Sequence, residues 1–470
     1  MSNTKTENPE QINKLPIVAV LITGAFLAIL NQTLLATAIP HIMEDLNLTE
    51  NTAQWVTTVF MLVNGIMIPI TAFLIETFTA RKLFLTAMSI FAFGTLVCSF
   101  APDFTLLMIG RVIQAAGAGI MIPLMMTIFL LIFPIEKRGT AMGTVGLVIG
   151  FAPALGPVIS GWLVEQYPWR ALFYVVLPFA IINIIIAYFV MKNVTEQTYP
   201  KVDVLSIILS TLGFGGLLLG FSSAGNVGWT DTVVALSLSV GAVSLTAFIL
   251  RQLKLKQPIL EFRVLKNKIF TISTVIGMIA FIGLIGAETI LPIYMQTMAG
   301  YTALQSGLII LPGALIMGFM SPVNGRIFDK FGARYLVITG LTLLTITSFL
   351  YTTLTPETSL AFITTVFAIR MFGISMIMMP ATTAGLNQLP NKLIPHGSAM
   401  TNTMRQVAAS IGTAILITVM TATALNTGPD ATPADLIHGV NISFYVTTGL
   451  SLIGLVLAFY IKGTRPTAQA

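Results

Sequence analysis

The chain has 470 residues, of which 55% are hydrophobic and only 9% are charged, whereas about a quarter of the residues in a soluble globular domain carry charge. Its formal net charge of +6 at pH 7 would by itself allow a nucleic-acid partner. The composition excludes an ordinary soluble protein. Apolar stretches of about twenty residues recur along the chain, which predicts an all-α polytopic membrane protein.

Fourteen such stretches follow one another. We expect membrane-spanning helices at residues 15–39, 52–75, 82–100, 104–130, 140–164, 170–191, 203–222, 232–251, 269–296, 304–326, 335–354, 358–380, 399–423 and 440–461. The first stretch is longer than the apolar region of a signal peptide and has no small-residue cleavage pattern, so it is predicted to remain as a helix.

The basic residues mark one side of the membrane. All of the 24 Lys and Arg residues except Arg111, Arg170 and Arg370 lie in one set of alternate loops, at the neighbouring span ends or in the two tails. Cytoplasmic loops are the ones enriched in Lys and Arg. The pattern predicts a multi-pass protein of the cell (inner) membrane with both termini in the cytoplasm, and it accounts for the positive charge without any nucleic acid.

The sequence contains an internal repeat. Residues 72–83 resemble residues 325–336, Arg111 matches Arg370, and Gly-Thr-Ala-Met at 139–142 matches Gly-Ser-Ala-Met at 397–400, at offsets of 253 to 259 residues. This period equals eight spans and predicts two six-helix halves separated by two inserted helices, an arrangement typical of alternating-access transporters. The expected divisions are a cytoplasmic tail (1–14), an N-terminal six-helix bundle (15–192), two inserted helices (203–251), a cytoplasmic linker (252–268), a C-terminal six-helix bundle (269–461) and a second cytoplasmic tail (462–470).

Both copies of the first repeated segment pair an acid with a base five residues later: Glu76 with Arg81, and Asp329 with Arg334. Such a pair across a tight turn can bind the ends of neighbouring helices in one conformation and release them in another. The alternative is simple anchoring of the loop at the cytoplasmic surface.

The fifth span carries small residues and prolines at regular spacing: Gly150, Pro153, Gly156, Pro157 and Gly161. Small residues let helices approach closely, and proline opens backbone hydrogen bonds, so this helix is suited to the flexible wall of a cavity. The equivalent part of the second half has no such pattern.

These features resemble the major facilitator superfamily, and within it the fourteen-helix drug:proton antiporters of the EmrB/QacA type, including lincomycin-resistance-like exporters. The resemblance covers essentially the whole chain. It implies the major facilitator fold with helices grouped 6+2+6, a gating role for the acid–base pairs and an antiporter motif in the fifth span. The first gating copy has Ala72, Glu76 and Thr79 where the family favours Gly, Asp and Gly, so Asp329 and Arg334 are expected to matter more than Glu76 and Arg81.

Arg111, followed by Gln114, looks like the arginine motif of the family's fourth helix. An arginine within a span needs partners or a wet cavity. Arg111 can bias a neighbouring acid toward releasing its proton, or it can bind backbone carbonyls of the first span; both interpretations stay open. For Arg370, a structural role is expected.

Glu288 is the one carboxyl well within a span, which makes it the candidate for proton coupling, with Arg111 as its companion. A carboxyl in a medium of low dielectric constant favours the protonated form and can release its proton when the site rewets. The alternative is a permanently neutral side chain that serves packing. Asn31 occupies the position where the resemblance leads us to expect a titratable aspartate, which favours neutral or weakly basic amphiphiles over quaternary ammonium compounds.

Polar side chains near these spans are candidates for a substrate cavity. They are Asn31, Gln32, Asn64, Gln114, Tyr294 and Gln296.

The resemblance implies a proton-driven multidrug efflux transporter for small amphiphilic compounds, with lincosamide-like antibiotics among the candidates. The alternative is a dedicated exporter or flippase of an endogenous metabolite or lipid. A channel or a receptor would lack uphill, proton-dependent transport. No nucleotide-binding loop, metal-ligand cluster or catalytic constellation is evident, so neither an enzyme nor a cofactor is expected, and the proton gradient is the energy source. The fold is sufficient as a monomer in the lipid bilayer.

Overall fold

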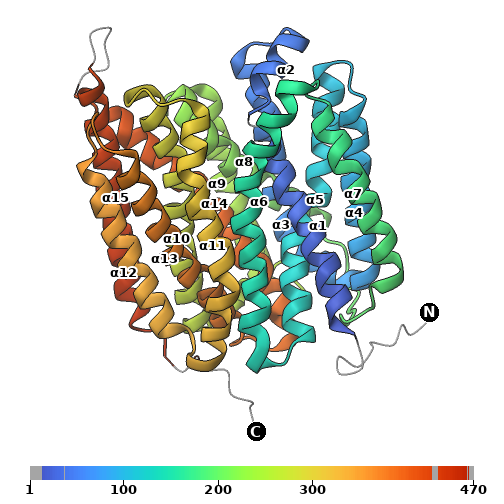
Figure 1. Cartoon of the computed structure of the whole chain (residues 1–470). Helices are drawn as coiled ribbons and strands as arrows, with labels where there is room; N and C mark the ends of the chain where they lie inside the picture. The colour runs from blue at the N-terminus through green and yellow to red at the C-terminus, as the bar shows by residue number, and fades with distance from the viewer. Residues whose placement is uncertain (1–12, 36, 426–431, 463, 465–470) are drawn as a thin grey trace.

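A computed structural model describes residues 13–35, 37–425, 432–462 and 464. The predicted tails, 1–14 and 462–470, lie almost entirely outside the described residues. Within the described part the regular structure is helical throughout, and the long helices run side by side as one bundle (Figure 1).

Fourteen helices in the described part are long and apolar enough to cross a membrane, which confirms the predicted number. They are α1 (Lys14–Leu34), α3 (Glu50–Thr77), α4 (Ala80–Ser99), α5 (Phe104–Ile132), α6 (Arg138–Gln166), α7 (Ala171–Val190), α8 (Val204–Val227), α9 (Thr232–Lys254), α10 (Lys268–Ile293), α11 (Ala303–Phe331), α12 (Ala333–Leu350), α13 (Leu360–Leu386), α14 (Ile394–Ala422) and α15 (Pro433–Ala458). The chain is therefore a multi-pass membrane protein.

Several predicted span ends differ from the structure by about five to seven residues, because hydropathy does not show where a helix is capped. The first span ends at Leu34 instead of residue 39, and a short helix α2 (Ile39–Leu46) follows with proline in its first turn, where proline is favoured. The last span begins at Pro433, earlier than residue 440, because Thr432 and Asp435 form a reciprocal capping box.

The helices pack as two groups with an inserted pair. In the first group α5 packs against α3 and α4, and in the second α13 packs against α10, α11 and α12. The two groups meet most closely where α6 lies along α11. Helices α8 and α9 pack on each other, and α8 also contacts α3 of the first group and α14 of the second. The inserted pair thus lies against the junction of the two halves.

An ion pair joins the start of α8 to the last turn of α9. The Nε and Nη2 atoms of Arg251 donate to the two carboxylate oxygens of Asp203 at 2.8 and 3.0 Å. The hydrogen bond from Arg251 holds the pKa of Asp203 at about 2, well below its usual range. These residues are the first and last of the predicted insert, although α9 itself continues to Lys254.

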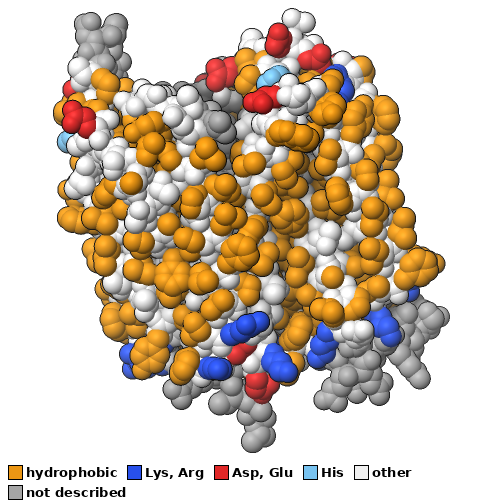
Figure 2. Space-filling view, in the orientation of Figure 1, with side chains coloured by type: hydrophobic (Ala, Val, Ile, Leu, Met, Phe, Trp, Pro, Cys, Tyr) orange, Lys and Arg blue, Asp and Glu red, His pale blue; other side chains and the backbone are white. Residues whose placement is uncertain are grey.

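Charge is distributed unevenly along the bundle. Lys and Arg side chains gather at the end where α1 begins and α15 ends, and hydrophobic side chains cover the middle (Figures 1 and 2). We call this end the basic end and the opposite one the far end. The apolar belt between them is the surface that faces the lipid hydrocarbon.

Candidate functional site

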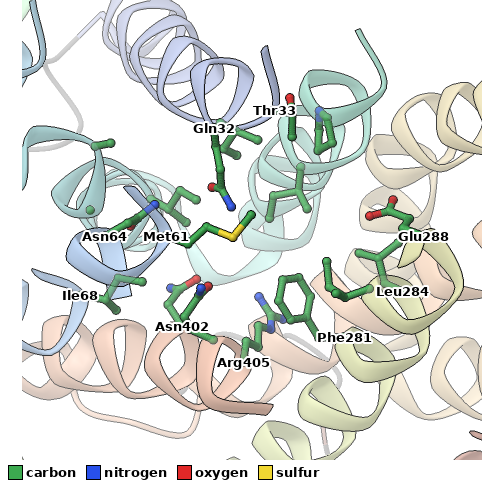
Figure 3. A pocket seen from close by; sticks show the side chains of 18 of the residues that line it. Gln32, Thr33, Met61, Asn64, Ile68, Phe281, Leu284, Glu288, Asn402 and Arg405 are labelled. Atoms are coloured by element: carbon green, nitrogen blue, oxygen red, sulfur yellow. The ribbon is translucent and has the colours of Figure 1, made fainter. Parts of the chain in front are cut away.

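A cavity of about 290 Å³ lies between the two halves. It is lined by α1, α3, α5 and α6 of the first half and by α10, α13 and α14 of the second (Figure 3). Most of the lining is apolar. Its polar side chains are Gln32, Thr33, Asn64, Glu288, Thr289, Asn402, Arg405 and Gln406. A mostly apolar cavity with a few polar groups is typical of a site for a small amphiphilic molecule.

Glu288 is the one carboxyl among the lining residues. It lies on α10, is partly buried, and makes no hydrogen bond or ion pair with any other residue that the structure describes. Figure 3 shows its carboxylate pointing toward the cavity. A carboxyl placed this way faces the cavity and is not held by a hydrogen bond or an ion pair within the described residues.

Of the six predicted cavity residues, Gln32 and Asn64 line the cavity. The other four do not line this cavity. Asn31 and Gln114 are buried and bind Arg111, and the Tyr294 hydroxyl donates to the carbonyl of Thr355 at 2.7 Å. Gln296 is exposed on a π-helical turn after α10. Sequence position alone could not show which side of each helix faces the cavity.

Arg111 is fully buried and does not line the cavity. Its Nη1 donates to the side-chain oxygens of Asn31 and Gln114 at 2.6 and 2.7 Å, its Nε donates to the carbonyl of Val56, and its guanidinium lies over the ring of Phe60. No carboxylate pairs with it within the described residues. Arg111 therefore binds the side-chain amide of the first span and a backbone carbonyl of the second, in place of the backbone carbonyls of the first span that one interpretation expected.

Arg370, the repeat mate of Arg111, is also buried and binds backbone. Its Nε and Nη2 donate to the carbonyl of Gly283 on α10, and its Nη1 donates to the Ser348 hydroxyl at 2.7 Å. These three hydrogen bonds join α13 to α10 and α12.

At the basic end, Asp329 of the second half binds the first turn of α6 in the first half. Its two carboxylate oxygens accept from the backbone N–H of Gly139 at 2.7 Å, the backbone N–H of Thr140 at 2.8 Å and the Thr140 hydroxyl at 2.6 Å. A helix N-terminus attracts negative charge and has free N–H groups to donate.

Glu76 of the first half corresponds to Asp329 in the repeat, and it contacts the second half. Its Oε1 lies 3.0 Å from Nε2 of His396 in the first turn of α14, and the Nδ1 of that histidine accepts the backbone N–H of Glu261. His396 was missed by the sequence reasoning. The repeat was a usable signal, because His396 corresponds to Arg138, which crosses the same junction to Asn387 at 3.0 Å.

We call these three contacts, Asp329 with the start of α6, Glu76 with His396, and Arg138 with Asn387, the basic-end gate. Every hydrogen bond between the two halves among the described residues lies in the basic-end part of the bundle. The structure is therefore a conformation closed at the basic end.

The bases of the two motifs do not join the halves. Arg81 donates to the carbonyl of Tyr188 and lies over its ring, within the first half. Arg334 has no hydrogen bond or ion pair within the described part of the chain. Only the acids of the motifs, Asp329 and Glu76, contribute to the gate.

Gly150 and Gly156 of α6 let this helix approach α11 and α1 closely. A Cβ on Gly150 would lie 2.9 Å from the backbone nitrogen of Gly318, and one on Gly156 would lie 2.1 Å from the Thr33 hydroxyl on α1. Pro153 lines the cavity. Pro157 is partly buried, and a Cβ on Gly161 would meet nothing within 4 Å. The motif thus combines residues of the helix interface with residues of the cavity wall, and Gly161 belongs to neither.

Arg405 is the second functional candidate that sequence reasoning missed. It was counted with the basic residues at the cytoplasmic span ends, but it lies inside α14, is 3% exposed and lines the cavity. Its position inside the predicted span 399–423, and not in a loop, was the available signal.

Two repeat-related helical bundles surround a central cavity, and within the described residues hydrogen bonds join them only between the basic end and the cavity. This arrangement defines a membrane transporter of the alternating-access class. The chain belongs to the Major Facilitator Superfamily, whose family model matches residues 21–413. Members of this family are transporters of small substrates and not enzymes.

Characterised and uncharacterised relatives share nearly the whole length. The chain is 55% identical to the uncharacterized MFS-type transporter YcnB of Bacillus subtilis, over 99% of both chains. It is 42% identical to the lincomycin resistance protein LmrB of Listeria monocytogenes, over 97% of this chain and 98% of that protein. The solved structure of the human organic anion transporter MFSD10 (TETRAN) has a TM-score of 0.70, with 14% identity and coverage of 95% of this chain and 100% of that one, and so shares the fold.

Proposed function

We propose that this protein is a proton-driven exporter of small amphiphilic compounds, lincosamide-like antibiotics among them, that works by alternating access. The observation that carries the proposal is Glu288, an unpartnered carboxyl in an otherwise largely apolar cavity between the two halves. Similarity to lincomycin resistance proteins supports export of antibiotics. The basic end faces the cytoplasm in this proposal, as expected for the side rich in Lys and Arg.

In the proposed cycle, Glu288 takes up a proton from the cell exterior while the basic-end gate is closed. Protonation removes a charge from an apolar cavity, which lowers the cost of closing the cavity around it. When the basic end opens, the proton leaves to the cytoplasm, and the substrate binds there for the return step. Substrate and protonated carboxyl therefore occupy the cavity in alternation.

One proton per cycle is sufficient energetically. A proton entering through a potential of about 150 mV releases roughly 3.5 kcal/mol. This free energy supports a substrate gradient of about 300-fold. The single carboxyl of the cavity is enough to drive export.

The test is substrate-dependent proton release from acidified inverted vesicles. Wild type and Glu288→Gln are compared with lincomycin, a fluorescent dye and a quaternary ammonium compound as substrates. We expect Glu288→Gln to lower proton release at least tenfold, because the amide cannot carry a proton, while substrate binding persists. The carboxyl of Glu165, exposed on α6, provides the matched control Glu165→Gln, which should release protons like the wild type.

Equal proton release by wild type and Glu288→Gln would contradict the role of Glu288. Absence of release with every compound would instead favour the dedicated exporter of a metabolite or lipid.

A further inference from the structure

Arg405 is the one cationic side chain among the residues that line the cavity. It lies on α14 and is 3% exposed. Figure 3 shows it beside Phe281, on the same side of the cavity as Asn402. A buried guanidinium is costly unless its charge and its N–H groups are satisfied.

The protein satisfies only part of this guanidinium, which has five N–H groups. The Nη2 atom donates to the carbonyl of Met378 at 3.0 Å and to the hydroxyl of Thr382. The buried Nε and Nη1 atoms have no acceptor among the described residues. Two contacts on one nitrogen hold the side chain in place and leave the other two nitrogens without an acceptor.

The other buried arginines differ from Arg405. All three guanidinium nitrogens of Arg370 donate to protein oxygens. Arg111 lacks an acceptor only at Nη2, and it lies away from the cavity. Arg405 combines a position on the cavity wall with the fewest satisfied nitrogens.

No carboxylate of the described residues neutralises Arg405. The Arg405 side chain packs beside Gly277 on α10, and a Cβ added to Gly277 would lie 3.5 Å from Nε of Arg405. Glu288 is eleven residues further along the same helix, which at about 1.5 Å per residue corresponds to a rise of about 16 Å toward the far end. The two charges therefore occupy different levels of one cavity.

We propose that Arg405 binds the anionic headgroup of an amphiphilic substrate, a carboxylate or a group of the same charge, whose apolar body lies along Phe281, Leu284 and Met378 toward Glu288. This assignment rests on the proposed function and gives it a substrate class. The anion supplies the acceptors that Nη1 and Nε lack, through charge-assisted hydrogen bonds. It adds acidic amphiphiles to the neutral or weakly basic ones that Asn31 suggests.

Binding of matched probes tests this assignment. The full-length protein in nanodiscs of phosphatidylcholine is titrated with dansyl-labelled undecanoic acid and with its uncharged methyl ester, and binding is followed by dansyl fluorescence. The same titrations use Arg405→Gln and Arg405→Lys. The thermal unfolding of each variant is compared with wild type to verify the fold.

We expect wild type to bind the acid on the order of tenfold more tightly than the ester, as for a hydrogen bond to a charged group. Arg405→Gln should lose this preference while its affinity for the ester is unchanged. Arg405→Lys should keep part of the preference. An acid preference that survives in folded Arg405→Gln would overturn the assignment.

Two further outcomes separate this assignment from the proposed function. If wild type binds acid and ester equally, the anion site is wrong and export of amphiphiles still stands. If it binds neither, both are wrong for this class of compound. A lipid phosphate is the other source of an anion: nanodiscs with phosphatidylglycerol should then weaken acid binding to wild type but not to Arg405→Gln.

Discussion

Asp329→Ala is expected to shift the protein away from the conformation closed at the basic end and to abolish most transport. Asp329 accepts three hydrogen bonds from Gly139 and Thr140 across the two halves. Hydrogen bonds to a charged group are strong, and loss of all three should destabilise the closed conformation by about 2 to 4 kcal/mol, roughly 30- to 1000-fold in the equilibrium between the two conformations.

Spin labels on Glu165 and Glu357, exposed residues near the far ends of the two halves, can report this shift in a Cys98→Ser background. Opening of the basic end brings the far ends together, so the variant should show a shorter distance between the labels. The matched control is Glu76→Ala at the repeat-related position. It removes a single contact, to His396, and should shift the equilibrium only about fivefold.

Equal label distances in Asp329→Ala and wild type would contradict a gating role for this acid. An effect of Glu76→Ala as large as that of Asp329→Ala would show that the histidine contact carries more of the closure than its geometry indicates.

Gly325→Ala is expected to prevent closure at the basic end. A Cβ on Gly325 would lie 2.2 Å from the carbonyl oxygen of Gly139 and 2.8 Å from its carbonyl carbon. Both atoms belong to the backbone, so no side chain can move aside and α6 and α11 must separate. That separation also lengthens the bonds of Asp329 to α6. We expect at least a tenfold loss of transport and the same change in label distance as in Asp329→Ala.

Gly161→Ala is the matched control, because it makes the same substitution on α6 where the added Cβ meets nothing within 4 Å. Alanine is the better helix former, so this variant should be as active and as stable as the wild type or slightly more stable. Full transport by Gly325→Ala would show that the two helices have room to adjust and that close packing at this point is not required.

The sequence by itself determined the membrane class, the number of spans and the presence of two related halves. Runs of apolar residues must be helical in lipid because every backbone polar group has to be satisfied internally, so hydropathy alone sets the number of spans. The repeat placed Asp329 and Glu76 in equivalent positions, and the structure shows each of them binding the opposite half.

Only the tertiary structure decided what each polar side chain faces. Asn31 and Gln32 are neighbours in sequence, yet one binds Arg111 inside the first half and the other lines the cavity. Arg405 was grouped with the cytoplasmic basic residues, and the packing of α14 against α10 shows that it lines the cavity. Hydropathy averages over the circumference of a helix, whereas the function of a polar residue depends on the direction of its side chain, which only packing between helices fixes.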